Sequence, residues 1–133
     1  MGNPNKAKGD RAEKAVLDYV LEFFPESWRT RAGWDDDRGD VVLDLLGDQT
    51  MTVALQVKDT GAVPGTPEFQ ALGAQVAAGS HWSGVIWHKI RGKAHPKEWR
   101  VMMTGAEYIR LMVYVRQLEA HLEGVGSDGQ GYR

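Results

Sequence analysis

The stretch DVVLDLLGDQTMTVALQVK, residues 40–58, contains two runs rich in Val and Leu on either side of a Gly-Asp-Gln turn. Short apolar runs bounded by turn residues are typical of strands, and a connection this short predicts an antiparallel hairpin. The predicted strands are Asp40–Leu46 and Met51–Lys58. Alternate residues of a strand face the same side, so Gln56 and Lys58 should stand side by side, next to Asp40 if the strands pair.

Before the hairpin, apolar residues recur at spacings of three and four, which is the pattern of one face of a helix. This pattern predicts a helix from Gly9 to Phe24, ended by Pro25. Glu13 lies at the margin of the apolar stripe, so its carboxylate can reach a sheet that the helix covers. An extended segment from Trp28 to Arg31 and a polar loop over residues 33–39 should follow.

After the hairpin, Thr66 is a good N-cap residue and Pro67 suits the first position of a helix, which should end near Gly79. Two further strands are predicted at Ser83–Ile90 and Glu98–Met103, joined by a basic turn. The residues expected on the buried side of the helix are Phe69, Leu72 and Val76.

Thr104 and Glu107 are spaced as a capping box at the start of a long last helix. Residues 124–133 are rich in Gly and Ser and predict a flexible tail, which leaves residues 1–123 as a single domain. The element order α, β, β, β, α, β, β, α predicts the α/β class. The apolar residues expected on one face of the last helix are Tyr108, Leu111, Met112, Val115, Leu118 and Leu122.

The composition fits one soluble domain. With 133 residues and 42% hydrophobic content, the chain can bury one sizeable core. No apolar run approaches the length that crosses a bilayer, and the N-terminal MGNPNKAKGD is polar, unlike a signal peptide. We therefore expect a soluble cytoplasmic protein. The absence of cysteine excludes disulfides, thiolate zinc sites and a cysteine nucleophile.

The net charge of -2 argues against non-specific coating of nucleic acid, because that mode of binding needs a broad basic surface. Local contacts with phosphate remain open, since the cations are clustered. The densest cluster covers residues 89–100, where five cations accompany the single anion Glu98. This turn either grips a phosphate or is an ordinary solvated turn.

Four short motifs follow one another in the first half of the chain. They are Lys8-Gly9-Asp10-Arg11-Ala12-Glu13, Trp28-Arg29-Thr30-Arg31, Arg38-Gly39-Asp40-Val41-Val42 and Leu55-Gln56-Val57-Lys58. In this order and on the predicted elements, they resemble the PD-(D/E)XK nuclease superfamily, and within it the archaeal-type Holliday junction resolvases and their phage relatives. The resemblance implies a restriction-endonuclease-like three-layer core, in which helices flank a mixed central sheet of about five strands.

The resemblance also implies a magnesium-dependent endodeoxyribonuclease, with manganese able to replace magnesium. Phosphodiester hydrolysis adds negative charge to an anionic phosphate, and a divalent cation neutralises that charge and delivers hydroxide at neutral pH. Magnesium accepts carboxylate and amide oxygens as ligands. On this resemblance the metal ligands are Glu13, Asp40 and Gln56, and the fourth catalytic residue is Lys58, which orients the attacking water or offsets transition-state charge.

The chain departs from the commoner family pattern at two points. Gln56 stands where most members carry an acid, so the site has one negative charge fewer and weaker metal affinity is expected. Junction resolvases often carry a catalytic serine in the loop, but no serine lies between Arg31 and Asp40, which leaves that role to Thr30 or unfilled. The acidic run at residues 35–37 either adds a ligand or is a solvated loop.

For a resolvase the expected substrate is branched DNA, recognised through phosphates and junction shape in recombination or repair. A four-way junction has two equivalent strands to cut, so a homodimer is expected. The long last helix or the exposed aromatic strands would supply its interface, unless that helix closes the core of the monomer. The cations expected nearest the DNA are Lys6, Lys8, Arg11, Arg29 and Arg31.

Two other hypotheses remain. A flap or repair nuclease of the VRR type also has a strand with Gln/Glu-x-Lys followed by a helix containing glutamine, here Gln70 or Gln75. The second hypothesis is a non-catalytic DNA-binding or assembly module, in which Gln56 indicates a catalytic site that has lost its activity. Each candidate residue also has an ordinary structural explanation, such as a surface ion pair for Glu13 or an edge-strand lysine for Lys58.

Overall fold

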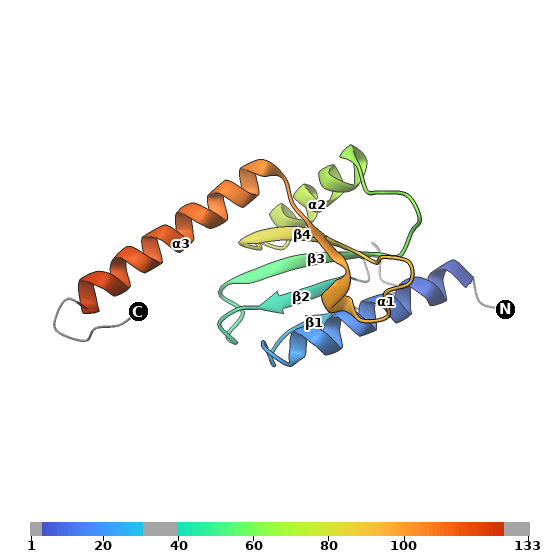
Figure 1. Cartoon of the computed structure of the whole chain (residues 1–133), viewed down its shortest axis with the longest axis horizontal. Helices are drawn as coiled ribbons and strands as arrows, with labels where there is room; N and C mark the ends of the chain where they lie inside the picture. Colours follow the sequence, from blue (N-terminus) through green and yellow to red (C-terminus); the bar gives the residue numbers. More distant parts are fainter. Residues whose placement is uncertain (1–3, 31–39, 127–133) are drawn as a thin grey trace. The chain divides into compact units, whose positions relative to one another are not determined.

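The computed structural model describes residues 4–30 and 40–126 of the chain (Figure 1). Apart from the short 3-10 helix η1, the order of its helices and strands is the predicted one. The chain divides after Met103 into two compact units, which are described separately. In chain order the elements are α1 (Pro4–Leu21), β1 (Trp28–Arg29), β2 (Val41–Asp44), β3 (Thr52–Lys58), α2 (Thr66–Ala78), β4 (Ser83–His88), η1 (Pro96–Glu98), β5 (Arg100–Met102) and α3 (Gly105–Gly126).

The strands form one mixed sheet in the order β1-β2-β3-β4-β5. β3 and β4 are parallel, and every other pair of neighbours is antiparallel. Parallel neighbours need a long crossover connection, which α2 provides. The predicted hairpin is confirmed, with Val41 opposite Leu55 and Asp44 opposite Thr52. The predicted α/β class, with a mixed five-stranded sheet and flanking helices, is therefore confirmed.

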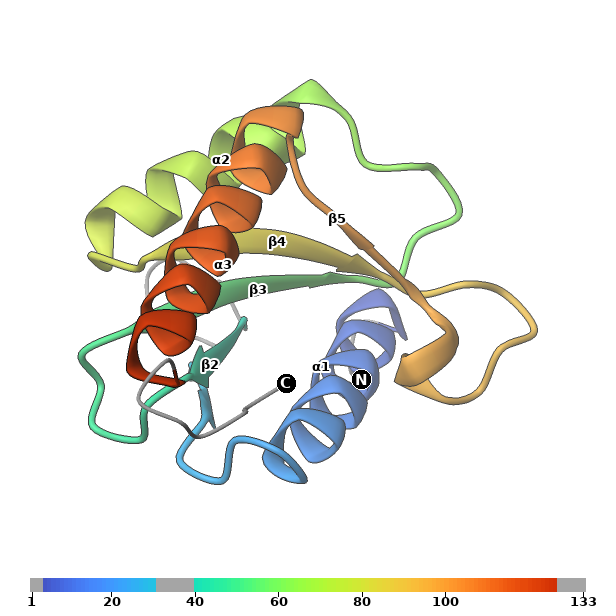
Figure 2. The same ribbon diagram turned by 60° about the vertical axis from the view of Figure 1, so that its left-hand side comes forward.

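The two faces of the sheet carry different helices (Figure 2). Val41 and Leu55 belong to one buried cluster with the apolar side of α1. Ala54 belongs to a second cluster with Leu72 of α2, so the side predicted to be buried in this helix is confirmed. Because side chains alternate along β3, Gln56 shares the face of Ala54 and looks toward α2.

Several element ends differ from the predictions. α1 begins at Pro4 rather than Gly9, since proline is favoured in the first turn and nothing between the two residues stops the helix. The N-cap of α2 is Gly65, not Thr66, and the carboxylate of Glu68 accepts the Gly65 N–H at 2.7 Å. α1 also stops at Leu21, one turn before the predicted end.

β2 ends at Asp44 rather than Leu46 because the Asp44 carboxylate organises the turn that follows. Its oxygens accept the N–H groups of Gly47 at 2.9 Å and of Gln49 at 3.0 Å. Gly47 has φ +82°, a left-handed conformation that glycine adopts at little cost. The predicted Gly-Asp-Gln turn is thus confirmed, and it begins earlier than expected.

The basic turn between β4 and β5 contains η1, which the sequence did not predict. The indole N–H of Trp87 donates to the carbonyl of Pro96 at 3.1 Å, and that of Trp99 donates to the carbonyl of Lys93 at 2.7 Å. These bonds draw the turn against the sheet. β4 consequently ends at His88 rather than Ile90, and β5 begins at Arg100 rather than Glu98.

The second unit begins at Thr104, whose Oγ1 accepts the N–H of Glu107 at 3.2 Å, one half of the predicted capping box. α3 continues to Gly126, so residues 124–126, expected in the tail, are helical, and residues 127–133 lie outside the described part. Across the described residues, none of the helices has the length and apolar character needed to span a bilayer. The exposed apolar side chains of α3 include Tyr108, Ile109, Met112, Val115, Leu118 and Leu122.

Candidate metal centre

Asp40, Gln56 and Gln75 form a chain of hydrogen bonds on the α2 side of the sheet. Nε2 of Gln56 donates to Oε1 of Gln75 at 3.0 Å, and Nε2 of Gln75 donates to Oδ2 of Asp40 at 2.8 Å. Asp40 directly precedes β2 and is the neighbour of Gln56 across the hairpin, since Val41 pairs with Leu55. We call these three side chains the amide relay. Asp40 and Gln56 are both buried.

The acceptor at one end fixes the direction of the amide relay. A carboxylate can only accept hydrogen bonds, so Gln75 must turn its NH₂ group toward Asp40 and its oxygen toward Gln56. Gln56 must then present its own NH₂ group to Gln75. Its oxygen, Oε1, is left buried with no hydrogen-bond partner among the described residues. A buried oxygen without a partner is costly, so this atom marks a position suited to a cation or another donor.

Lys58 ends β3 on the same face as Gln56, as the strand alternation predicted, and is half-buried. Its charge is felt at the start of α2. The pKa of Glu68 lies below its ordinary value, mainly because the Gly65 N–H donates to that carboxylate and in smaller part because of the Lys58 ammonium. Lys58 therefore places a cation beside the end of β3 that carries Gln56.

Glu13 lies on the other side of the sheet, on α1. Its Oε1 accepts hydrogen bonds from Nε of Arg29 at 3.0 Å and from Nη2 of Arg29 at 2.6 Å. Asp10 accepts a further bond from the same guanidinium at 2.8 Å. Burial raises the pKa of the Glu13 carboxyl, although Arg29 acts in the opposite direction. The predicted reach of Glu13 to the sheet is thus observed, but its target is Arg29 of β1 rather than Asp40.

The structure therefore separates the four predicted catalytic residues into two groups. Asp40, Gln56 and Lys58 face the α2 side, where the first two share the amide relay. Glu13 is on the α1 side, in an ion-pair cluster with Arg29 and Asp10. The sheet lies between α1, which carries Glu13, and α2, which carries Gln75 (Figure 2).

Of the cations predicted to lie nearest DNA, Lys6, Lys8 and Arg11 are exposed on α1. Arg29 is occupied by its two carboxylate partners. Arg31 lies outside the described residues, as do the acidic run at residues 35–37 and the rest of the predicted polar loop.

Gln75 is the member of the amide relay that the main sequence prediction missed. The sequence offered it only as one of two glutamines in the alternative nuclease hypothesis. The periodicity of α2 distinguishes the two, because Gln75 lies three residues after the buried Leu72, on the inward side, whereas Gln70 is exposed. A polar residue within an apolar helical stripe was therefore the available signal.

The oxygen atoms of the amide relay suit a hard divalent cation. Magnesium is bound in proteins by one or two carboxylates and keeps several waters, and the Asp40 carboxylate with the Gln56 amide oxygen supplies such a partial ligand set. Within residues 4–30 and 40–126, no group of three or more His, Asp or Glu side chains could hold a metal ion by itself. Comparisons with protein-family models, with curated proteins and with solved structures find no match.

Proposed function

We propose that the protein is a metal-dependent endonuclease that hydrolyses phosphodiester bonds in branched DNA, with a Holliday junction as the preferred substrate. The observation that carries the proposal is the buried, unpartnered Oε1 of Gln56, a side chain that Gln75 links to the Asp40 carboxylate. When bound at these oxygens, magnesium or manganese supplies a hydroxide at neutral pH and offsets the charge of the transition state.

Each residue of the α2 face has a separate role in this proposal. Asp40 contributes the negative charge and Gln56 a neutral oxygen. Gln75 donates to Asp40 and accepts from Gln56, and so fixes the spacing and orientation of both. Lys58 donates a hydrogen bond to the attacking water or to a phosphate oxygen, because an ammonium group has three donors and no acceptor.

Glu13 has a positioning role in the proposal. Its carboxylate and that of Asp10 hold the Arg29 guanidinium in place on β1, next to β2. This guanidinium can bind a phosphate only if the phosphate replaces one of its two carboxylate partners. Removal of Glu13 should therefore affect DNA binding and the order of β1 more than metal binding.

A preference for junctions requires a homodimer, since paired cuts need two sites related by two-fold symmetry. α3 supports this part of the proposal. Its residues 108, 111, 115, 118 and 122 are apolar and alternate at spacings of three and four, which is the seam of a two-stranded coiled coil. Leu118→Glu should convert a dimer to a monomer in light scattering, while Arg116→Glu, off the seam, should not.

The proposal is tested with synthetic four-way junctions, flaps and plain duplexes of the same sequence, in magnesium or manganese. Paired symmetric nicks near the branch are expected, and Asp40→Asn should abolish them while DNA binding without metal persists. Asp18→Asn is the matched control, because Asp18 is an exposed acid whose partner is Lys14. Binding without any metal-dependent cleavage would favour the non-catalytic module instead.

A nuclease of the VRR type is the second candidate, and the amide relay favours it. That hypothesis rests on a strand with Gln-x-Lys followed by a glutamine-bearing helix, and Gln56, Lys58 and Gln75 now have this arrangement, with Gln56 and Gln75 in direct contact. The same panel of substrates separates the two candidates. Cleavage of flaps without paired nicks at junctions would support the second.

A further inference from the structure

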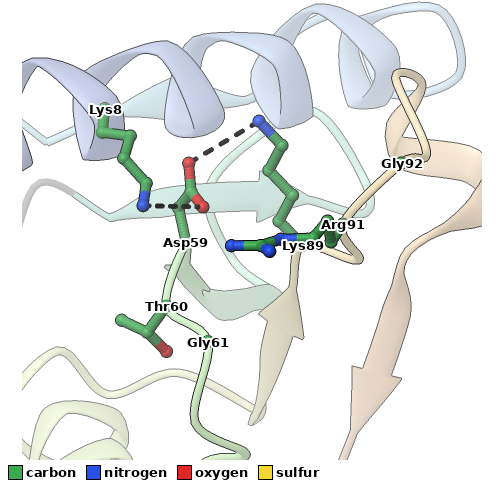
Figure 3. Close-up of a pocket in the computed structure, with 7 residues that line it drawn as sticks. All are labelled: Lys8, Asp59, Thr60, Gly61, Lys89, Arg91 and Gly92. Carbon is green, nitrogen blue, oxygen red and sulfur yellow. Dashed lines mark ion pairs between the residues drawn. The ribbon is translucent and has the colours of Figure 1, made fainter.

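A basic cavity of about 330 Å³ lies on the first unit at the ends of β3 and β4 (Figure 3). Three separate segments build it: α1, the residues just after β3, and the turn after β4. Neither the amide relay nor the Glu13 cluster contributes to it. The lining residues are Lys8, Asp59, Thr60, Gly61, Lys89, Arg91 and Gly92.

Three cations surround one carboxylate in this cavity. Nζ of Lys8 lies 3.7 Å from Oδ1 of Asp59, and Nζ of Lys89 lies 3.6 Å from Oδ2 of Asp59. Both distances exceed that of a good hydrogen bond, so the ammonium groups keep donors for another acceptor. Oδ2 of Asp59 is buried and accepts no hydrogen bond from any described residue. With three cations and one anion, the lining carries an excess of positive charge.

Two of the three cations, Lys8 and Lys89, are held in place before any ligand arrives. Asp59 attracts both lysines from its position after β3, and the Lys89 ammonium also lies 5.6 Å from the centre of the Trp99 ring. Arg91 has no ion pair to Asp59 or to another described carboxylate, so its guanidinium is available for two parallel hydrogen bonds. Gly61 and Gly92 leave their backbone open, since a Cβ at either would meet no atom within 4 Å.

We infer that this cavity binds a backbone phosphate of a nucleic-acid strand. A phosphodiester carries one negative charge and accepts hydrogen bonds from ammonium and guanidinium groups, which matches the lining. The excess of positive charge opposes a metal ion. Asp59 serves as the counter-ion that keeps the lysines in place, and the ligand faces the three cations.

The location connects the cavity with the amide relay, and the inference rests on the proposed function in that the bound strand is the one to be cut. Asp59 is three residues after Gln56, which corresponds to about 10 Å along an extended strand. Ligands of open α/β sheets bind beyond the carboxyl ends of parallel strands, and β3 and β4 both end here. The cavity therefore holds a phosphate near, but not at, the scissile bond.

The test measures DNA binding in EDTA, so that it does not depend on cleavage. Lys89→Gln/Arg91→Gln removes two lining cations, and Lys97→Gln/Arg100→Gln removes one exposed lysine and one exposed arginine from the same turn and β5. The first double variant should weaken binding about tenfold and reduce the salt dependence by about one unit per lost phosphate contact. The control should change binding less than about twofold.

A second arm locates the phosphate. Neutral methylphosphonates are placed one at a time along one strand. At one position the substitution should weaken binding of the wild-type protein and have no effect on Lys89→Gln/Arg91→Gln, as a double-mutant cycle requires for a direct contact. The inference is overturned if no methylphosphonate position shows this coupling, or if the two double variants weaken DNA binding equally. It is also overturned if inorganic phosphate, at a concentration equal to that of the DNA, displaces the DNA from the protein.

The outcome is independent of catalysis. If a coupled methylphosphonate position is found but metal-dependent cleavage is not, the phosphate site is supported and the nuclease proposal fails. If cleavage is found and no position is coupled, the nuclease proposal stands and the phosphate site fails.

Discussion

The carboxylates on the two faces of the sheet have different hydrogen-bond partners. On the α1 face, Glu13 and Asp10 share the Arg29 guanidinium, which compensates part of their charge. On the α2 face, Asp40 accepts from a neutral amide, and the amide relay leaves the oxygen of Gln56 without a partner. A cation gains more at a buried oxygen that has no hydrogen-bond partner, such as Oε1 of Gln56. In the proposed function, the metal ion therefore binds on the α2 face, and the carboxylates of the α1 face hold Arg29 in place.

The largest expected effect comes from removing a carboxylate on each face. Asp40→Asn should lower metal-dependent cleavage by about 100-fold or more, because it removes the charge that faces the cation. Glu13→Gln should lower cleavage less than about tenfold, because Arg29 keeps Asp10 as a partner. Single-turnover cleavage rates at saturating manganese measure both. Equal losses for the two variants would contradict the division of roles.

The next effect concerns the glutamine that links Asp40 to Gln56. Gln75→Leu should lower the free energy of unfolding by about 1–3 kcal/mol, since it removes the hydrogen bonds that Gln75 makes with Gln56 and with Asp40. Gln70→Leu, at an exposed position of the same helix, should change it by less than about 0.5 kcal/mol. Urea unfolding monitored by tryptophan fluorescence gives both values. A Gln75→Leu protein as stable as wild type would show that the amide relay is not formed.

A charge added to the α2 face should strengthen metal binding. Gln56→Glu replaces the neutral oxygen by a carboxylate, so the magnesium concentration for half-maximal activity should fall about tenfold. Gln70→Glu adds the same charge at an exposed site and should leave this concentration nearly unchanged. Isothermal titration with manganese checks the affinity directly. If Gln56→Glu binds manganese no more tightly than the wild type does, the ion does not bind at Gln56.

The smallest effect is the pH dependence of the α1 face. Burial raises the pKa of Glu13 above its ordinary value of 4.5, so the folded state holds this proton more tightly than the unfolded chain. The resulting stabilisation is complete below pH 4.5 and is lost as pH rises through the folded pKa. As the pH rises from 4.5 through the folded pKa, the free energy of unfolding of the wild type, relative to that of Glu13→Gln, should therefore fall by less than about 1 kcal/mol. If an NMR titration gives the Glu13 carboxyl a pKa below 4.5, the pH dependence of stability has the opposite sign and this prediction is wrong.

The sequence predicted the parts of the fold that depend on local patterns. The alternation around Asp40 and Lys58 gave the hairpin and the shared face of Gln56 and Lys58, and the 3.6-residue period gave the buried side of α2. The cap of α2 depends on a single hydrogen bond, from the Gly65 N–H to the Glu68 carboxylate, which the apolar pattern does not specify. Boundaries were accordingly the least accurate part of the prediction.

The candidate sites were harder to predict, because they depend on which face each helix covers. Glu13 was grouped with Asp40 from the family resemblance, whereas the packing of α1 directs it to Arg29. The basic cavity joins Lys8, Asp59 and Arg91, which lie in three distant segments. No spacing rule along the chain brings these residues together, so only the tertiary structure reveals the cavity.

A crystal structure of the manganese-soaked protein tests the central claim most directly, because anomalous scattering locates the ion without reference to activity. The account predicts one ion at the α2 face, about 2.1 Å from an Asp40 oxygen and from Oε1 of Gln56, a distance typical of a small divalent cation. An ion bound by Glu13 and Asp10 on the α1 face, with Arg29 displaced and the amide relay unchanged, would contradict it.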